Sequence, residues 1–94
     1  MITIEPNPQA PNITNKIKTE IEDLTHPENY VLSLQLDYRE NNTIFYLNKV
    51  EKIHFAKDWM EIEQKNNSHA YFDYSHILEY CVINAEDVID LGVI

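Results

Sequence analysis

One stretch of regular alternation constrains this chain more than any other feature. Between Tyr30 and Tyr38, Leu32, Leu34 and Leu36 occupy every second position. A β-strand places successive side chains on opposite faces, so a period of two predicts a strand with one buried face. A strand is not stable alone, so the rest of the chain has to supply partner strands.

Short apolar segments separated by turn residues follow this strand. Residues 43–47 are apolar on both faces, a pattern typical of a central strand. Residues 50–55 break the alternation once, as a β-bulge does. The repeated Asn-Asn pairs, at residues 41–42 and 66–67, predict turns. Further strands are expected at residues 59–63, 69–74 and 77–83.

A helix is predicted before the first of these strands. Ile13, Ile17 and Ile21 recur at a spacing of four, which forms one apolar stripe on a helix. Asn12 is the predicted N-cap, and the residues before Pro27 end the helix because the residue before a proline avoids helical dihedrals. The stripe is narrow, so this helix should lie against another element.

The chain of 94 residues is long enough for one domain. We expect an α+β fold, in which an N-terminal helix is followed by about five short antiparallel strands in a strongly bent sheet or a small partly open β-barrel. An open two-layer arrangement with the helix over one sheet face is the alternative. The predicted parts are a Pro-rich extended arm at 1–11, a helix at 12–25, an antiparallel sheet at 29–83 and an acidic turn or strand at 84–94. The arm either folds back on the domain, with a short strand near residues 2–4, or reaches a neighbour.

Residues 50–83 resemble the second half of small SH3-like or Sm-like β-barrel domains, which pair an N-terminal helix with bent strands. The rhythm of Val50, Ile53, Trp59 and Ile62, followed by the segment 72–80, is also similar to the end of YolD-like proteins. The chain departs from the Sm pattern, which has glycine before the bend, where this sequence has Asn48-Lys49. The resemblance implies a small barrel and carries over no RNA-contacting or ring-forming residue.

Charge narrows the classes of partner. The chain has 16 acidic and 7 basic residues, a net charge of −9, and no lysine or arginine after Lys65. Such a surface repels nucleic-acid phosphates and anionic lipid, so we expect neither direct nucleic-acid nor membrane binding. It attracts a basic protein surface by long-range steering, although acidity that serves only solubility is the simpler alternative.

Candidate catalytic groups do not form a persuasive set, so we expect neither an enzyme nor a cofactor or metal site. His69, Asp73 and His76 would share a face only on a helix, whereas their segment alternates as a strand. Cys81, for which His54 or His76 could act as a base, sits mid-strand, where an inert buried thiol is expected. Glu61 and Glu63 share a strand face that we expect to be solvated. A small enzyme would need a deep pocket holding at least two of His54, His69, His76, Glu61 and Asp73.

Aromatic residues interleaved with acids indicate a binding surface instead. Tyrosine offers a large contact area at low entropic cost, and tyrosines cluster with acids in the base-free stretch 66–94. The partner-binding residues predicted from this pattern are Tyr71, Asp73, Glu79, Tyr80, Glu86, Asp87 and Asp90.

These observations favour a small acidic protein-binding module. We expect a non-catalytic inhibitor of the phage anti-defence or bacterial immunity type. It would block the basic groove of a nuclease or other nucleic-acid enzyme by charge mimicry. The alternative is a self-assembling structural or ligand-binding small β-barrel, with a homodimer through an edge strand. The start of the chain lacks the basic and apolar regions of a signal peptide, so a cytoplasmic location is expected.

Overall fold

The computed structural model describes residues 2–24, 30–38 and 41–84. Within these ranges it contains seven strands, one α-helix and one short 3-10 helix, η1. Their bounds are β1 Thr3–Glu5, α1 Asn12–Glu22, β2 Tyr30–Tyr38, β3 Asn41–Asn48, β4 Val50–Phe55, β5 Trp59–Gln64, β6 His69–Asp73, η1 Tyr74–His76 and β7 Ile77–Asn84.

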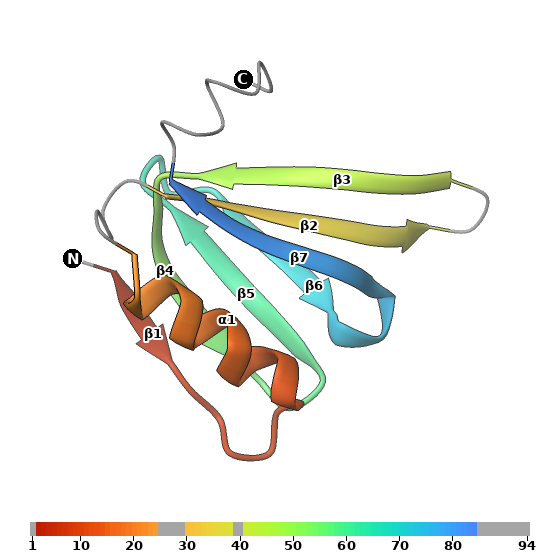
Figure 1. Cartoon of the computed structure of the whole chain (residues 1–94), viewed down its shortest axis with the longest axis horizontal. Coiled ribbons are helices and arrows are strands. Elements are labelled where there is room, and N and C mark those ends of the chain that lie inside the picture. The colour runs from red at the N-terminus through yellow and green to blue at the C-terminus, as the bar shows by residue number, and fades with distance from the viewer. Residues whose placement is uncertain (1, 25–29, 39–40, 85–94) are drawn as a thin grey trace.

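The strands form two separate sheets (Figure 1). Sheet A has the order β1-β4-β5-β6, and sheet B has the order β3-β2-β7. The expected α+β fold with one strongly bent antiparallel sheet or partly open barrel is therefore wrong. The described part of the chain is mostly strand with one short α-helix, neither sheet closes into a barrel, and β1 joins β4 in parallel. Alternation locates strands but does not determine which strands pair, and this is why the prediction failed.

A corner between β3 and β4 separates the two sheets. Lys49 adopts a left-handed conformation with φ 50°, which redirects the chain from sheet B into sheet A. Its carbonyl oxygen accepts a hydrogen bond from the backbone N–H of Lys65 at 2.8 Å. The side-chain amide of Gln64 donates to the carbonyl oxygen of Asn48 at 2.9 Å. Gln64 and Lys65, at the end of β5, therefore stabilise this corner through hydrogen bonds to Asn48 and Lys49.

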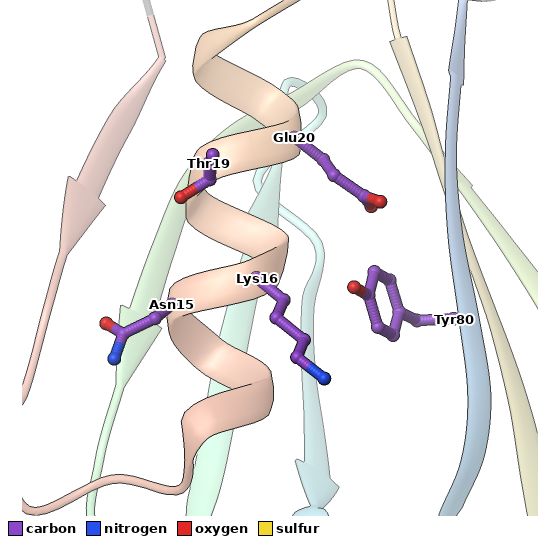
Figure 2. Close-up of a pocket in the computed structure, with 5 residues that line it drawn as sticks. All are labelled: Asn15, Lys16, Thr19, Glu20 and Tyr80. Carbon is purple, nitrogen blue, oxygen red and sulfur yellow. The ribbon is translucent and has the colours of Figure 1, made fainter.

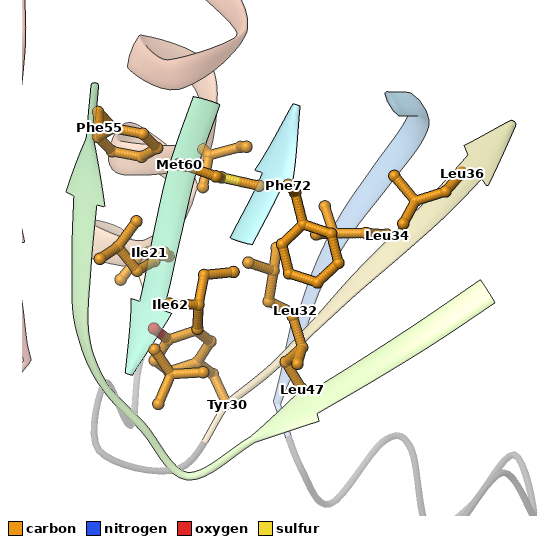
Figure 3. Close-up of a cluster of buried hydrophobic side chains, with 13 residues drawn as sticks. Ile21, Tyr30, Leu32, Leu34, Leu36, Leu47, Phe55, Met60, Ile62 and Phe72 are labelled. Atoms are coloured by element: carbon orange, nitrogen blue, oxygen red, sulfur yellow. The ribbon is translucent and has the colours of Figure 1, made fainter. Parts of the chain in front are cut away.

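One hydrophobic core lies between the two sheets and the helix (Figure 3). Leu32, Leu34 and Leu36 of β2 are at most 1% exposed, which confirms the buried face predicted from the alternation. They meet Ile53 and Ile62 of sheet A, which are fully buried. Complete burial of a side chain of this size is worth about 1.5–3 kcal/mol, so this cluster dominates the stability of the fold.

Helix α1 covers the same face of sheet A as sheet B does (Figure 1). Ile17 and Ile21 are buried in the core, as the apolar stripe predicts. The predicted cap is wrong, because the helix includes Asn12 and its N-cap is Pro11, with no side-chain capping bond. The hydroxyl of Thr14 donates to the Pro11 carbonyl oxygen at 2.8 Å instead.

Strand β3 lies at an edge and not at a centre. In the described part of the chain it pairs with β2 alone, so the prediction of a central strand was wrong. Ile44 and Tyr46 are 50% and 47% exposed on its outer face. An apolar pattern on both faces predicts burial, but here one face of the strand remains in solvent. The predicted bulge is confirmed by a register shift between Val50 and Lys52.

The N-terminal arm folds back on the domain through β1. Thr3 and Glu5 of β1 stand in register with Lys52 and His54 of β4. Ile4 between them packs against the core. Parallel pairing over this short element extends sheet A by one strand. Of the predicted acidic segment 84–94, Asn84 ends β7, and residues 85–94 lie outside the described residues. Within the described ranges, no helix is long and apolar enough to cross a membrane.

Candidate functional site

The outer face of sheet A, turned away from the core, carries several charged and polar side chains that form hydrogen bonds with one another. On β5, Met60 and Ile62 point into the core and are fully buried. Strand geometry then places the alternate side chains on the opposite face. The residues that share this face are Glu5, Lys52, His54, Trp59, Glu61, Glu63, His69, Tyr71 and Asp73.

A row of four of these residues crosses the whole sheet. Glu5 of β1 is in register with His54 of β4. His54 is in register with Glu61 of β5, and Glu61 with Tyr71 of β6. Residues directly opposite one another have Cβ atoms about 4.5–5.5 Å apart, so each member of the row can contact the next.

Glu61 organises the β5–β6 end of this row. Nδ1 of His69 lies 2.8 Å from the Glu61 carboxylate, and the hydroxyl of Tyr71 donates to the same oxygen at 2.9 Å. An ionised carboxylate only accepts hydrogen bonds, so Nδ1 of His69 carries the proton. The hydrogen bond from His69, with that from Tyr71, lowers the pKa of the Glu61 carboxyl. The hydrogen bond that Tyr71 donates to Glu61 raises the pKa of the Tyr71 hydroxyl. Glu61 is therefore held ionised with a fixed orientation.

Glu5 contacts two basic side chains at the β1–β4 end of the row. Its carboxylate lies 2.8 Å from Nδ1 of His54 and 3.5 Å from Nζ of Lys52. The hydrogen bond from His54, helped by the charge of Lys52, lowers the pKa of the Glu5 carboxyl. Two carboxylate–histidine pairs thus lie on one face, one at each end of the row.

Trp59 lies beside the row and forms an aromatic platform with Tyr71, the last residue of the row. Their ring centroids are 5.6 Å apart, and the centroid of the Trp59 ring is 5.9 Å from that of His54. Trp59 is 37% exposed and Tyr71 is 62% exposed. Asp73 is in register with Trp59 and is also exposed. Aromatic faces flanked by carboxylates are suited to hold a guanidinium or ammonium group by cation–π and charge-assisted contacts.

The groups considered for catalysis from the sequence lie on both sheets. Glu61 and Glu63 project from the same face of β5, and both are half-buried. Within the residues that the structure describes, no group of three His, Cys, Asp or Glu side chains could hold a metal ion. The thiol of Cys81 was expected to be buried, but it is exposed, since it lies on the outer face of sheet B in register with Ser33.

The structure separates the residues predicted from the sequence as a partner-binding surface. Tyr71 and Asp73 lie together on the outer face of sheet A. Glu79 is exposed on β7 in sheet B. Tyr80 is half-buried and faces α1, where it lines a hollow of about 380 Å³ (Figure 2). Burial, with the charge of Glu20, raises the pKa of the Tyr80 hydroxyl. The remaining predicted residues, Glu86, Asp87 and Asp90, lie outside the described part of the chain.

Several residues of this face were not selected from the sequence. Alternation along β5 placed Trp59 and Glu61 on the face opposite Met60, which was a usable signal. The pairing of Glu5 with His54 had no comparable signal, because it depends on β1 meeting β4 in parallel across 49 positions of sequence.

No protein-family model matches the sequence, and no curated protein and no solved structure matches it. Any assignment of function has therefore to rest on the geometry and charge of this face.

Proposed function

We propose that this chain is a non-catalytic protein-binding module that binds a basic surface of a partner protein through the outer face of sheet A. The single observation that carries the proposal is the exposed Trp59–Tyr71 platform bordered by Glu61 and Asp73. Exposed aromatic pairs beside oriented carboxylates have the composition of an interface hot spot.

The charges of this face favour arginine as the anchor from the partner. A guanidinium stacks on an aromatic ring and forms hydrogen bonds with a carboxylate in the plane of its fork. Glu61 is already oriented by His69 and Tyr71, so little side-chain entropy is lost when it binds. The net charge of −9 steers a basic partner toward the protein before contact.

The partner class that suits these properties is a nucleic-acid enzyme with a basic groove. Carboxylates on this face would compete with substrate phosphates for the lysine and arginine side chains of such a groove. Binding would then block the substrate without any covalent chemistry, as an inhibitor of the anti-defence or immunity type does.

The test is a titration against a panel of purified nucleases with basic grooves, with the dissociation constant and the inhibition measured at several salt concentrations. We expect inhibition whose affinity falls as salt rises. The double variant Glu61→Gln/Asp73→Asn should weaken binding at least about tenfold. The matched control, Glu22→Gln/Asp23→Asn, removes the same charge from the exposed end of α1 and should weaken binding less than about threefold.

Trp59→Ala separates the aromatic contribution from the charge. It leaves the net charge at −9 and should also weaken binding at least about tenfold. Equal losses from the face variant and the α1 control would show that only total charge matters, and the proposed site would be wrong. Absence of salt-dependent binding to every member of the panel would contradict the proposed partner class.

A further inference from the structure

Strand β3 presents a long open edge. It runs for eight residues, and every one of them is in register with β2. No described strand pairs with its other side, where sheet B ends. Alternate residues of such an edge direct backbone N–H and C=O groups outward, ready to pair with another strand.

This edge lacks the usual protection against pairing. Among the strands that the structure describes, β3 alone has no charged residue, and it has no proline. The outermost strands of sheet A are shorter and carry Glu5 and Asp73, and β7 at the other side of sheet B carries Glu79. Edge strands that must stay single are normally short, charged or interrupted. The β3 edge is none of these.

The side chains beside this edge are apolar. Ile44 and Tyr46 stand two positions apart on the outer face of sheet B and are about half exposed, at 50% and 47%. Their neighbours across β2 are the uncharged Gln35 and Ser33. The outer surface at the middle of β3 is therefore a neutral strip on a molecule of net charge −9.

We infer that β3 pairs antiparallel with β3 of a second copy of this chain, so that two copies of sheet B become one continuous sheet. A basic partner gains no charge contact on a neutral strip and is drawn instead to the acidic surfaces. A second copy carries the same charge of −9 and can approach closely only where the contact surface is neutral. The middle of the β3 edge meets this condition.

The geometry also favours one register. Opposed residues in a sheet must have their side chains on the same face. The two-fold axis between the two β3 strands must therefore lie level with one residue of β3, and not level with the midpoint between two residues. An axis at Phe45 sets Ile44 opposite Tyr46 of the second copy, and the symmetric contact repeats this pair. It also sets Asn42 opposite Asn48 of the second copy, so the eight-residue strand overlaps over almost its full length.

This dimer uses sheet B and is independent of the binding function proposed for sheet A. The two interactions should respond to salt in opposite directions. Salt weakens the attraction between the acidic face and a basic partner, whereas it screens the repulsion between two acidic copies. Failure of one proposal therefore does not imply failure of the other.

Sedimentation equilibrium of the purified chain at several concentrations gives the first test. We expect a monomer–dimer equilibrium that tightens as NaCl rises from about 0.05 to about 0.5 M. Ile44→Lys and Tyr46→Lys should each weaken dimerisation at least about tenfold, because each places a charge at the paired edge. The matched control is Leu78→Lys, which charges a 51%-exposed apolar residue on β7 and should leave dimerisation within about threefold of wild type.

Each lysine variant is first checked for a wild-type circular dichroism spectrum and melting temperature. A chain that stays monomeric at all concentrations and salt levels would overturn the inference. So would a Leu78→Lys effect as large as that of Ile44→Lys, because it would place the contact on β7.

Disulfide cross-linking tests the register. In a Cys81→Ser background, the single variants Ile44→Cys and Tyr46→Cys are oxidised alone and as an equimolar mixture. Opposed residues in a sheet lie within the Cα–Cα range of a disulfide, about 4.4–6.8 Å. The covalent dimer should form predominantly in the mixture. Efficient dimers from either variant alone, with none gained on mixing, would overturn the axis at Phe45.

Discussion

At the scale of single residues, the outer face of sheet A is built from hydrogen bonds to carboxylates. Glu5 and Glu61 each accept from a histidine Nδ1 at 2.8 Å. Both carboxyls have pKa values below the usual 4.5, because their ionised forms are hydrogen-bonded in the folded protein. Side chains that are oriented before a partner arrives lose less entropy on binding, so these bonds would favour the binding that we propose for this face.

The lowered pKa values predict how stability depends on pH. A carboxyl whose pKa is lower in the folded than in the unfolded state contributes stability above the unfolded value, 4.5, and loses it as pH falls through the folded value. Wild-type protein should therefore lose stability as the pH falls below about 4.5. Glu61→Gln should lose less below that pH, as measured by urea unfolding at each pH.

Glu63→Gln is the matched control for this experiment. It removes one charge from the same face of β5 and leaves the hydrogen bonds of His69 and Tyr71 to Glu61 in place. Its pH dependence should stay closer to wild type than that of Glu61→Gln. Identical curves for wild type and Glu61→Gln would contradict the role given to these hydrogen bonds.

Tyr30 provides a second prediction at this scale. Its side chain is 1% exposed, and its hydroxyl has no hydrogen-bond partner among residues 2–24, 30–38 and 41–84. Burial raises the pKa of this hydroxyl. A buried hydroxyl without a partner costs about 1–3 kcal/mol, so Tyr30→Phe should raise the free energy of unfolding by about 1 kcal/mol. Urea unfolding measures the change, and a decrease of similar size would show that the hydroxyl does have a partner.

At the scale of elements, the chain passes from sheet B to sheet A at the corner between β3 and β4. Lys49 has φ 50°, a conformation that costs a residue with a Cβ atom about 1–2 kcal/mol. The hydrogen bond from the Lys65 N–H to its carbonyl holds this conformation. Strain at one residue thus accompanies the change from sheet B to sheet A.

Lys49→Gly should therefore stabilise the protein. Relief of the strain exceeds the extra chain entropy that glycine has in the unfolded state, and the expected net gain is about 0.5–1 kcal/mol. Lys49→Val should cost about 1–2 kcal/mol, because a β-branched residue tolerates this conformation poorly. Both changes are measured by chemical denaturation.

Asn67→Gly is the control for the corner. Asn67 also has a left-handed conformation, with φ 66°, but asparagine adopts it readily, so the expected change is close to zero. A gain at position 67 as large as that at position 49 would show that glycine acts in another way than by relieving strain at the corner.

At the scale of the whole molecule, net charge and the open β3 edge act against each other. A charge of −9 on 94 residues opposes both compaction and self-association. The uncharged edge of β3 favours self-association wherever that repulsion is screened. Ionic strength should therefore shift the protein between monomer and dimer, and it should separately weaken the binding of a basic partner to sheet A.

The same repulsion predicts that salt stabilises the folded monomer. The melting temperature should rise by about 2–5 °C between about 0.02 and 0.5 M NaCl, because like charges lie closer together in the folded state. Dilute Ile44→Lys protein is used for the scans, so that dimerisation does not add to the effect. Choline chloride should raise the melting temperature as NaCl does, because screening depends on ionic strength. A melting temperature that falls with salt would show that attractive ion pairs outweigh the repulsion.

The sequence by itself determined most of the local structure, although Asn41 and Asn42, which were expected in a turn, begin β3. Alternation in β2 and β5 identified strands and their buried faces, and the spacing of Ile17 and Ile21 identified the helix and its buried stripe. Of the residues in the proposed binding face, Tyr71 and Asp73 were selected from the sequence and do lie on one face. These features follow from strand and helix geometry, in which the period of a few neighbouring residues sets the direction of each side chain.

Only the tertiary structure decided which strands meet. The parallel pairing of β1 with β4, the division into two sheets and the position of β3 at an edge depend on contacts between segments far apart in sequence. The row from Glu5 to Tyr71 exists because four strands align in one register. Local patterns do not encode such alignments, because the free energy that selects them comes from packing the whole core and not from any one strand.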